Sequence, residues 1–313
     1  MLKNILIIII MATIWGTSFP ISKPAISEVG PYAFRLSCSI IAIIFIFLFF
    51  SKDILSEIKN ITYQNTWRLF LISVPNIFAV PVLNNIALKY TSVSYASILI
   101  YTMPCFTSLF MMFIFKKIKA LSLIAILLCA SGIYLITNNI KIDFGITIII
   151  ISAIIWSFGA ILSQNIVINL GFGTKLFWMS FISTILVIIT YPFFQEEQQI
   201  HLILCAFTNT SVLFSVIYIG FFGGAVVYYI WFYLIQYKSA EYASYSTLLS
   251  PIISVAIAYF FMDEELNSFQ FTGFFLILSS AVIINIAIPI IEKEKEKEKT
   301  NNIINDNSHR KSF

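Results

Sequence analysis

One pattern occurs twice in this chain, first as Tyr95-Ala-Ser-Ile-Leu-Ile-Tyr-Thr-Met-Pro104 and again as Tyr242-Ala-Ser-Tyr-Ser-Thr-Leu-Leu-Ser-Pro251. Each copy lies in the fourth of five apolar segments, and Trp15 in the first segment is likewise echoed by Trp156. An odd number of membrane spans in each repeat forces the two halves into opposite orientations. Inverted repeats of this kind place a site at the midplane between the halves. The repeat therefore predicts two inverted five-helix repeats.

Composition places the chain in a membrane. Its 313 residues are 59% hydrophobic and 11% charged, with a mean hydropathy of +0.92. Apolar runs of about 20 residues are long enough to cross the hydrocarbon as helices, and helices satisfy their own backbone hydrogen bonds there. The runs are continuous, unlike the alternating strands of a barrel. We expect an all-α integral membrane protein surrounded by lipid, with no nucleic-acid partner.

The apolar runs predict ten transmembrane helices. The first repeat occupies residues 1–141 and the second 142–291, followed by a charged, disordered cytoplasmic tail over 292–313. A short interfacial helix over 200–207 is one reading of the polar-to-apolar segment 195–210. The expected spans are 4–24, 31–50, 67–87, 93–115, 119–138, 144–167, 174–194, 211–236, 240–261 and 269–291.

The lysines and arginines predict the orientation, because loops on the cytoplasmic side carry an excess of them. With a cytoplasmic N-terminus, the inner loops receive Lys59, Lys117 and most other basic residues, whereas the outer loops receive Lys89, Lys141 and most acidic residues. This pattern predicts that both termini are cytoplasmic, in a bacterial inner membrane.

Several short motifs carry a family resemblance. They are Ala12-x-x-Trp15-Gly16, Pro31-x-x-x-Arg35, the two Ala-Ser…Pro patterns, and Asp263-Glu264. Together they resemble the EamA family of the drug/metabolite transporter superfamily over nearly all of residues 1–291. The resemblance implies ten helices, cytoplasmic termini, and export or exchange of small metabolites, often amino acids. One departure is Lys116-Lys117, where the family often has an acidic residue after the fourth helix.

Lys23 and Arg35 lie inside expected spans, near the outer ends of their helices, where an ionisable side chain marks a functional hypothesis. Lys23 either binds an anionic group of the substrate or reaches the outer headgroups or Glu28. Arg35 has the same alternatives, with a structural anchor favoured. Asn84 either binds substrate or joins helices, and Gln164 offers an analogous polar group in the second half.

Aromatic residues suggest the walls of a cavity. Trp15 and Trp156 hold equivalent positions, so we expect them on opposite walls of one central space, where an aromatic surface suits an apolar substrate portion. The two prolines of the repeated pattern predict kinks that gate access. The residues predicted to bind substrate are Trp15, Lys23, Asn84, Tyr101, Trp156, Gln164, Tyr229 and Tyr245, and those predicted to gate are Pro104 and Pro251.

These observations predict a secondary transporter that exports or exchanges amino acids or related small metabolites by alternating access. Uptake of a nucleoside-like or cofactor-like metabolite is one alternative, and a non-transporting membrane scaffold is another. No metal or cofactor is expected, because the cysteines lie singly in apolar runs, and no acid is expected at the midplane. The His, Asp and Glu clusters of membrane enzymes are missing from the sequence, so we expect no enzymatic activity.

Overall fold

The computed structural model describes residues 2–116, 120–137, 143–194, 199–237, 243, 247–284 and 290. The described secondary structure is helical throughout, as expected. The helices of the first half are α1 (Leu2–Val29), α2 (Pro31–Glu57), η1 (Ile58–Asn60), α3 (Tyr63–Ser73), η2 (Val74–Ala79), α4 (Val80–Tyr90), α5 (Val93–Ile100), α6 (Met103–Phe115) and α7 (Ala120–Thr137).

The helices of the second half come next in the chain. They are α8 (Phe144–Asn165), α9 (Phe172–Phe194), α10 (Gln199–Thr208), α11 (Thr210–Tyr218), η3 (Ile219–Val226), α12 (Val227–Tyr237), α14 (Ser250–Phe261) and α15 (Ser268–Val282). The short helix suggested near 200–207 is present as α10.

Eight of the described helices, or runs of adjoining helices, are long and apolar enough to cross a membrane. They coincide with the first eight expected spans. The last two expected spans correspond in the described residues to α14 and α15, which are shorter. Both expected spans also extend over residues outside the described ranges, so the count of ten stays a prediction. The chain is a multi-pass membrane protein.

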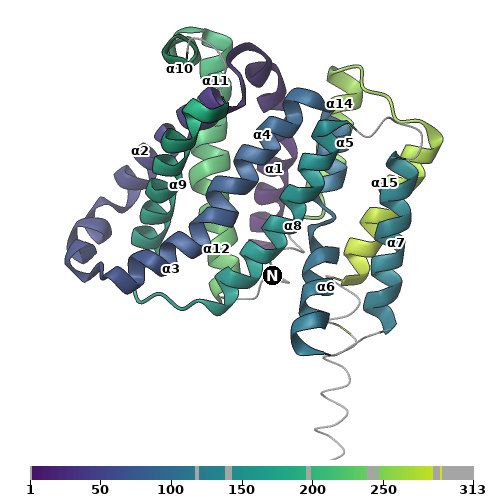
Figure 1. Ribbon diagram of the computed structural model, residues 1–313, viewed down its shortest axis with the longest axis horizontal. Helices are drawn as coiled ribbons and strands as arrows, with labels where there is room; N and C mark the ends of the chain where they lie inside the picture. Colours follow the sequence, from purple (N-terminus) through teal and green to yellow (C-terminus); the bar gives the residue numbers. More distant parts are fainter. Residues whose placement is uncertain are drawn as a thin grey trace, which may run out of the picture.

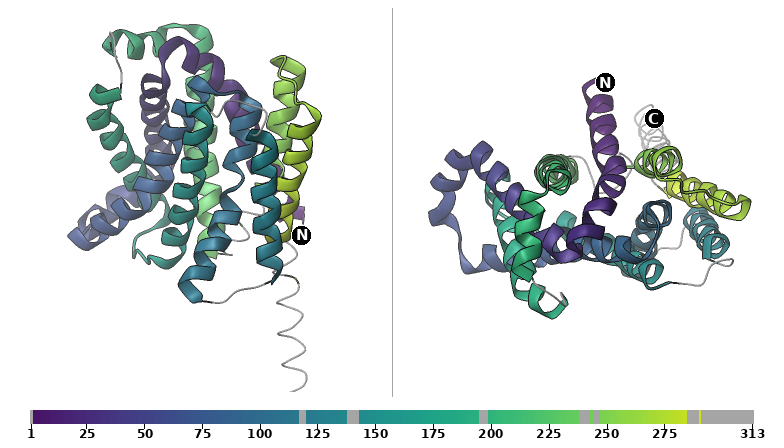
Figure 2. Two further views of the ribbon diagram at one scale, coloured as in Figure 1. Left: turned by 45° about the vertical axis from the view of Figure 1, so that its right-hand side comes forward. Right: turned by 90° about the horizontal axis from the view of Figure 1, so that it is seen from above.

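The helices stand side by side with their connections at two opposite ends. Figure 1 shows α2, α3 and α9 on one side, α6, α7, α14 and α15 on the other, and α1, α4, α8 and α12 between them. The α1–α2, α4–α5 and α14–α15 connections lie at the upper end, and the α2–α3 and α8–α9 connections at the lower end. The other views in Figure 2 keep this arrangement.

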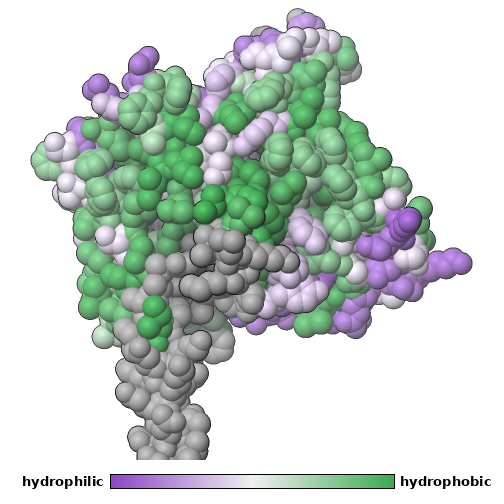
Figure 3. Space-filling view, turned by 180° about the vertical axis from the view of Figure 1, so that it is seen from behind, coloured by the Kyte–Doolittle hydropathy of each residue, from purple (hydrophilic) through white to green (hydrophobic). Residues whose placement is uncertain are grey.

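The surface supports a position in lipid. Figure 3 shows hydrophobic residues over the body of the molecule and hydrophilic residues toward its upper and lower ends. Many large apolar side chains point outward, among them Phe49, Phe113, Leu127 and Phe260. In water such a surface would be costly, whereas in hydrocarbon it is the expected exterior.

The fifth and tenth expected spans, α7 and α15, pack backbone to backbone. Gly132 of α7 faces Gly273 of α15, and a Cβ on either glycine would lie 2.7 Å from the other's carbonyl oxygen. Small residues permit this close approach between membrane helices. Gly132 and Gly273 thus join the fifth span to a helix of the second half.

The two repeated prolines begin helices. After α5 ends at Ile100, a turn leads into α6, with Pro104 in its first helical turn. Pro251 has the same place in α14. A proline in the first turn sacrifices no helical hydrogen bond, because the N–H it lacks would have no partner there. The sequence predicted kinked continuous helices at these prolines; the described chain instead has a turn before each one.

The third and eighth spans are each interrupted by a π-helical segment. In the third span this is η2, which contains Pro75 and Asn76. In the eighth it is η3, where a Cβ on Gly220 would lie 2.6 Å from Ile41 Cβ of α2. π-Helical turns often mark functional sites in helices, and both segments lie beside the pocket described below.

Candidate functional site

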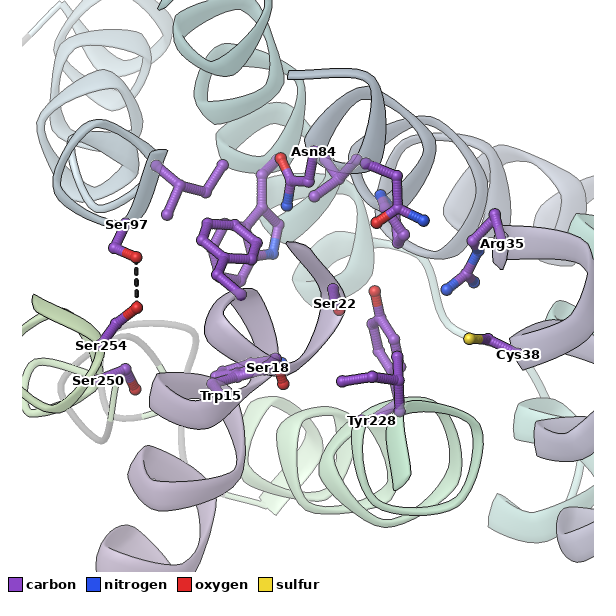
Figure 4. A pocket seen from close by; sticks show the side chains of 18 of the residues that line it. Trp15, Ser18, Ser22, Arg35, Cys38, Asn84, Ser97, Tyr228, Ser250 and Ser254 are labelled. Carbon is purple, nitrogen blue, oxygen red and sulfur yellow. Dashed lines mark hydrogen bonds between the residues drawn. The ribbon is translucent and has the colours of Figure 1, made fainter. Parts of the chain in front are cut away.

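A pocket lies between the two halves of the chain, with an empty volume of about 820 Å³ that includes its open mouth. Figure 4 views it from close by. Helices α1, α2, α4 and α5 line it from the first half, and α8, η3, α12 and α14 from the second. The lining residues are Trp15, Ser18, Phe19, Ser22, Arg35, Cys38, Val80, Pro81, Asn84, Asn85, Ser97, Ile100, Tyr101, Trp156, Ile219, Gly223, Tyr228, Ser250 and Ser254.

Three tryptophans form one wall of this pocket and the packing behind it. The ring centroids of Trp15 and Trp156 are 5.5 Å apart, edge to face, and Trp231 lies 5.3 Å from Trp15 and 5.5 Å from Trp156. Tyr101 adds an edge contact to Trp156 at 6.4 Å. Aromatic pairs favour these tilted geometries because ring edges are positive and ring faces negative. Trp15 and Trp156 therefore touch each other. The prediction that they lie on opposite walls of the space is wrong, because α1 and α8 bring the two rings into direct contact.

Polar side chains from both halves complete the lining. The side-chain oxygen of Asn84 accepts a hydrogen bond from Ser152 Oγ at 2.6 Å, and Figure 4 shows the amide nitrogen of Asn84 turned toward the pocket. Ser97 of α5 and Ser254 of α14 share a hydrogen bond of 2.5 Å. Tyr228 donates its hydroxyl hydrogen to the backbone oxygen of Asn76 at 2.9 Å. These bonds fix the lining across the boundary between the halves.

Arg35 is the charged side chain among the described residues that line the pocket. It is 7% exposed. Its Nη2 donates to the backbone oxygen of Ile77 at 2.9 Å, while its buried Nε has no hydrogen-bond partner. Figure 4 shows the guanidinium directed from α2 into the pocket, beside Tyr228 and Cys38. The described lining contains no carboxylate that would balance its charge.

Lys23 lies outside the pocket lining and bonds to the end of α4. Its ammonium donates to the backbone oxygen of Leu88 and, at 2.8 Å, to that of Thr91. Cations near a helix C-terminus satisfy its free carbonyls and interact favourably with the helix dipole. This contact gives Lys23 a structural partner other than Glu28, which was the pairing that the sequence left open. Its partner is the backbone of α4, whereas Glu28 bonds to the side chain of Asn209 at 2.7 Å.

Glu264 bonds to the beginning of α5, the helix that follows α4. Its two carboxylate oxygens accept hydrogen bonds from the backbone N–H groups of Val93 and Ser94, both at 2.8 Å. These groups open α5, where a negative charge is favourable. Lys23 and Glu264 therefore hold the two sides of the α4–α5 turn, one from each half of the chain.

The remaining predicted site residues are dispersed. Gln164 lines a second pocket between α3, α8, α9 and α12, where Lys175 donates to Gln236 Oε1 at 2.7 Å. Tyr229 is 36% exposed and stacks on Phe50, away from the first pocket. Tyr245 lies outside the described residues. The structure thus brings Trp15, Asn84, Tyr101 and Trp156 together, and places Lys23, Gln164 and Tyr229 elsewhere.

The predicted binding set omitted several residues at the site, among them Trp231 and Arg35. Trp231 completes the tryptophan cluster, but no equivalent tryptophan in the first half drew attention to it. Arg35 was interpreted mainly as an anchor because it lies one helical turn from the start of α2. Its position in an apolar span was the available signal, since a cation there needs a partner or a wet cavity.

Comparison with known proteins finds one transporter family and several transporter relatives. The model of the EamA-like transporter family matches residues 2–138 and again residues 143–286. An uncharacterized transporter of Clostridium kluyveri is 23% identical, with 90% of this chain and 93% of that protein aligned. The uncharacterized transporter YvbV of Bacillus subtilis is 22% identical, over 90% and 92%. The uncharacterized inner membrane transporter YedA of Escherichia coli is 21% identical, over 61% of each chain.

A solved crystal structure shares the fold. It aligns with a TM-score of 0.60 and 14% sequence identity, covering 93% of this chain and 99% of the other.

Proposed function

Because the chain belongs to the EamA-like transporter family, we propose that it is a secondary carrier that exports or exchanges small metabolites, amino acids or related compounds, by alternating access. Trp15, Asn84, Tyr101 and Trp156 bind the substrate in the pocket between the halves. A bacterial inner membrane is its location, with both termini in the cytoplasm.

The observation that carries this proposal is the composition of the pocket lining. Side chains from eight helical segments of both halves converge there. Its tryptophan wall offers a surface to an apolar or flat portion of a substrate, and Asn84 offers a polar group that fixes orientation. A site made by both halves changes its access when the halves move relative to each other, which is the requirement of alternating access.

Equivalent features in the two halves support the inverted five-helix repeats over 1–141 and 142–291. The family model matches each half separately. The third and eighth spans both contain π-helical segments, and the fourth and ninth both have a turn before a proline. In Figure 1, α5 begins at the end of the molecule where α14 finishes, so these helices run in opposite directions. Pro104 and Pro251 then mark paired gating elements.

The test begins with metabolite profiles of cells with and without the protein. Compounds whose cellular or external levels change are then loaded into proteoliposomes that contain the purified protein, and their exchange is measured. We expect exchange of at least one such compound by the protein and none by empty liposomes. Absence of exchange for every candidate would contradict a carrier function and leave the scaffold alternative.

Matched tryptophan variants tie that activity to the pocket. Trp15 borders the pocket, whereas Trp67 of α3 is 53% exposed and does not line it. We expect Trp15→Ala to weaken substrate affinity by about tenfold, because one aromatic contact contributes roughly 1 kcal/mol or more. Trp67→Ala should leave affinity unchanged. Equal effects of the two substitutions would remove the pocket from the proposal.

A further inference from the structure

We propose that the pocket selects substrates that carry a carboxylate, and that Arg35 is the residue that binds it. This inference rests on the proposed function and adds the substrate's charge to it. It starts from an imbalance: a permanently charged guanidinium is buried at the pocket, and the described lining supplies no acid beside it.

Such an imbalance has a physical cost. Taking an ion out of water costs several kcal/mol, which an opposite charge and hydrogen bonds offset. Arg35 cannot escape this cost by losing its proton, because arginine stays charged in proteins. Its hydrogen bond to the Ile77 carbonyl uses one guanidinium donor, and its Nε donor has no hydrogen-bond partner. An anionic substrate would supply the missing charge and acceptors.

The geometry of the group favours a carboxylate. A guanidinium presents paired N–H donors that match the two oxygens of a carboxylate or phosphate. A phosphate monoester carries about −1.5 to −2 charges at neutral pH, more than one arginine balances. In the described lining, Arg35 provides a single positive charge. A carboxylate therefore matches it more closely.

The rest of the pocket places the substrate's body. Figure 4 shows Arg35 and Trp15 on opposite sides of the pocket, with Tyr228 between them. A carboxylate held by Arg35 would direct the remainder of a small metabolite toward Trp15 and Asn84. The selected substrate class is thus a small carboxylic acid, or an amino acid, with an apolar or flat side.

Four probes of similar size test the assignment: 3-phenylpropionate, its neutral amide 3-phenylpropanamide, the cation 3-phenylpropylamine, and phenyl phosphate. Binding to the purified full-length protein is measured by calorimetry and by the shift in thermal unfolding midpoint, which rises with ligand occupancy. We expect 3-phenylpropionate to bind about tenfold to a hundredfold tighter than the amide, as charge-assisted hydrogen bonds require.

The variants separate charge from folding. Arg35→Gln should abolish the preference for the carboxylate over the amide, and Arg35→Lys should retain part of it. Arg68→Gln is the matched control, because Arg68 bonds to the Val167 carbonyl at an exposed site outside the pocket.

Asn85→Asp provides a second test that keeps Arg35. Asn85 donates to the Pro31 carbonyl, one helical turn before Arg35, so the new acid should compete with the probe.

Equal binding of carboxylate and amide, binding of neither, or tighter binding of phenyl phosphate would overturn the assignment. An unchanged carboxylate preference in a folded Arg35→Gln protein would do so as well. These outcomes differ from failure of the proposed function: proteoliposome exchange of a neutral compound, insensitive to Arg35, would leave a carrier without the inferred selectivity.

Discussion

Two cations within the membrane helices, the half-buried Lys23 and the buried Arg35, have different surroundings in this protein. Lys23 and Arg35 were both expected near the outer ends of their helices, with similar alternatives for each. Lys23 finds its partners in the carbonyls that end α4. Arg35 instead points into the pocket, and its buried Nε has no hydrogen-bond partner. The difference depends on neighbouring helices and not on either residue's own segment.

Replacement of Lys23 by methionine distinguishes anchoring from binding. Lys23→Met keeps the apolar stem and removes the donors, so the carbonyls of Leu88 and Thr91 lose a partner. We expect a loss of about 1–3 kcal/mol in stability, with substrate affinity unchanged. Thermal unfolding and binding on the same preparation measure both. A normal unfolding midpoint with a tenfold loss of affinity would instead place Lys23 in the binding site.

Helix pairs, rather than single residues, set the close approaches in the molecule. The α7–α15 pair depends on facing glycines whose backbones leave no space for a side chain. Similar conditions hold for Gly220 of η3 against α2, but not for Gly223 of the same segment. At Gly223 the nearest atom to an added Cβ is 3.6 Å away. The small residues of the membrane helices are therefore not equivalent.

This difference predicts the response to one added methyl group. Gly132→Ala should destabilise the protein by about 1–3 kcal/mol, because backbone or side-chain atoms must shift to admit the methyl. Gly223→Ala, at an open position, should stay within about 1 kcal/mol of the wild type. Thermal unfolding in one detergent compares the two. Equal stability of both variants would show that α7 and α15 do not pack as described.

The charge pattern predicts how the whole molecule is oriented across the membrane. Lys59 lies in η1, between α2 and α3, and Lys89 lies in the last turn of α4, which ends at the opposite side of the molecule. Cysteine substituted for Lys89 should react with an impermeant reagent outside intact cells, and cysteine substituted for Lys59 only after permeabilisation. Lys117 should behave as Lys59 does, and Glu197 as Lys89 does. A swapped pair would contradict the orientation and the inverted repeats that follow from it.

Sequence periodicity was sufficient for the helical fold because apolar runs of this length have few alternatives in lipid. The equivalent positions of Trp15 and Trp156 in the two repeats also predicted that both line one pocket. The sequence did not predict that the two rings touch, because this depends on how closely α1 and α8 approach. It also did not predict that Trp231 packs behind them. Gln164 and Tyr229 carried suitable chemistry, but the rotation of their helices turns them toward other surfaces.

In the proposed mechanism, the substrate crosses the membrane because one half of the chain moves against the other. Ser97 and Ser254 lie on opposite halves with their hydroxyls 2.5 Å apart, so cysteines at both positions should form a disulfide under oxidation. Transport in proteoliposomes by this double variant is the most direct test. We predict that oxidation stops exchange, that a reductant restores it, and that neither single variant responds. Exchange at an undiminished rate by the fully cross-linked protein would contradict the account.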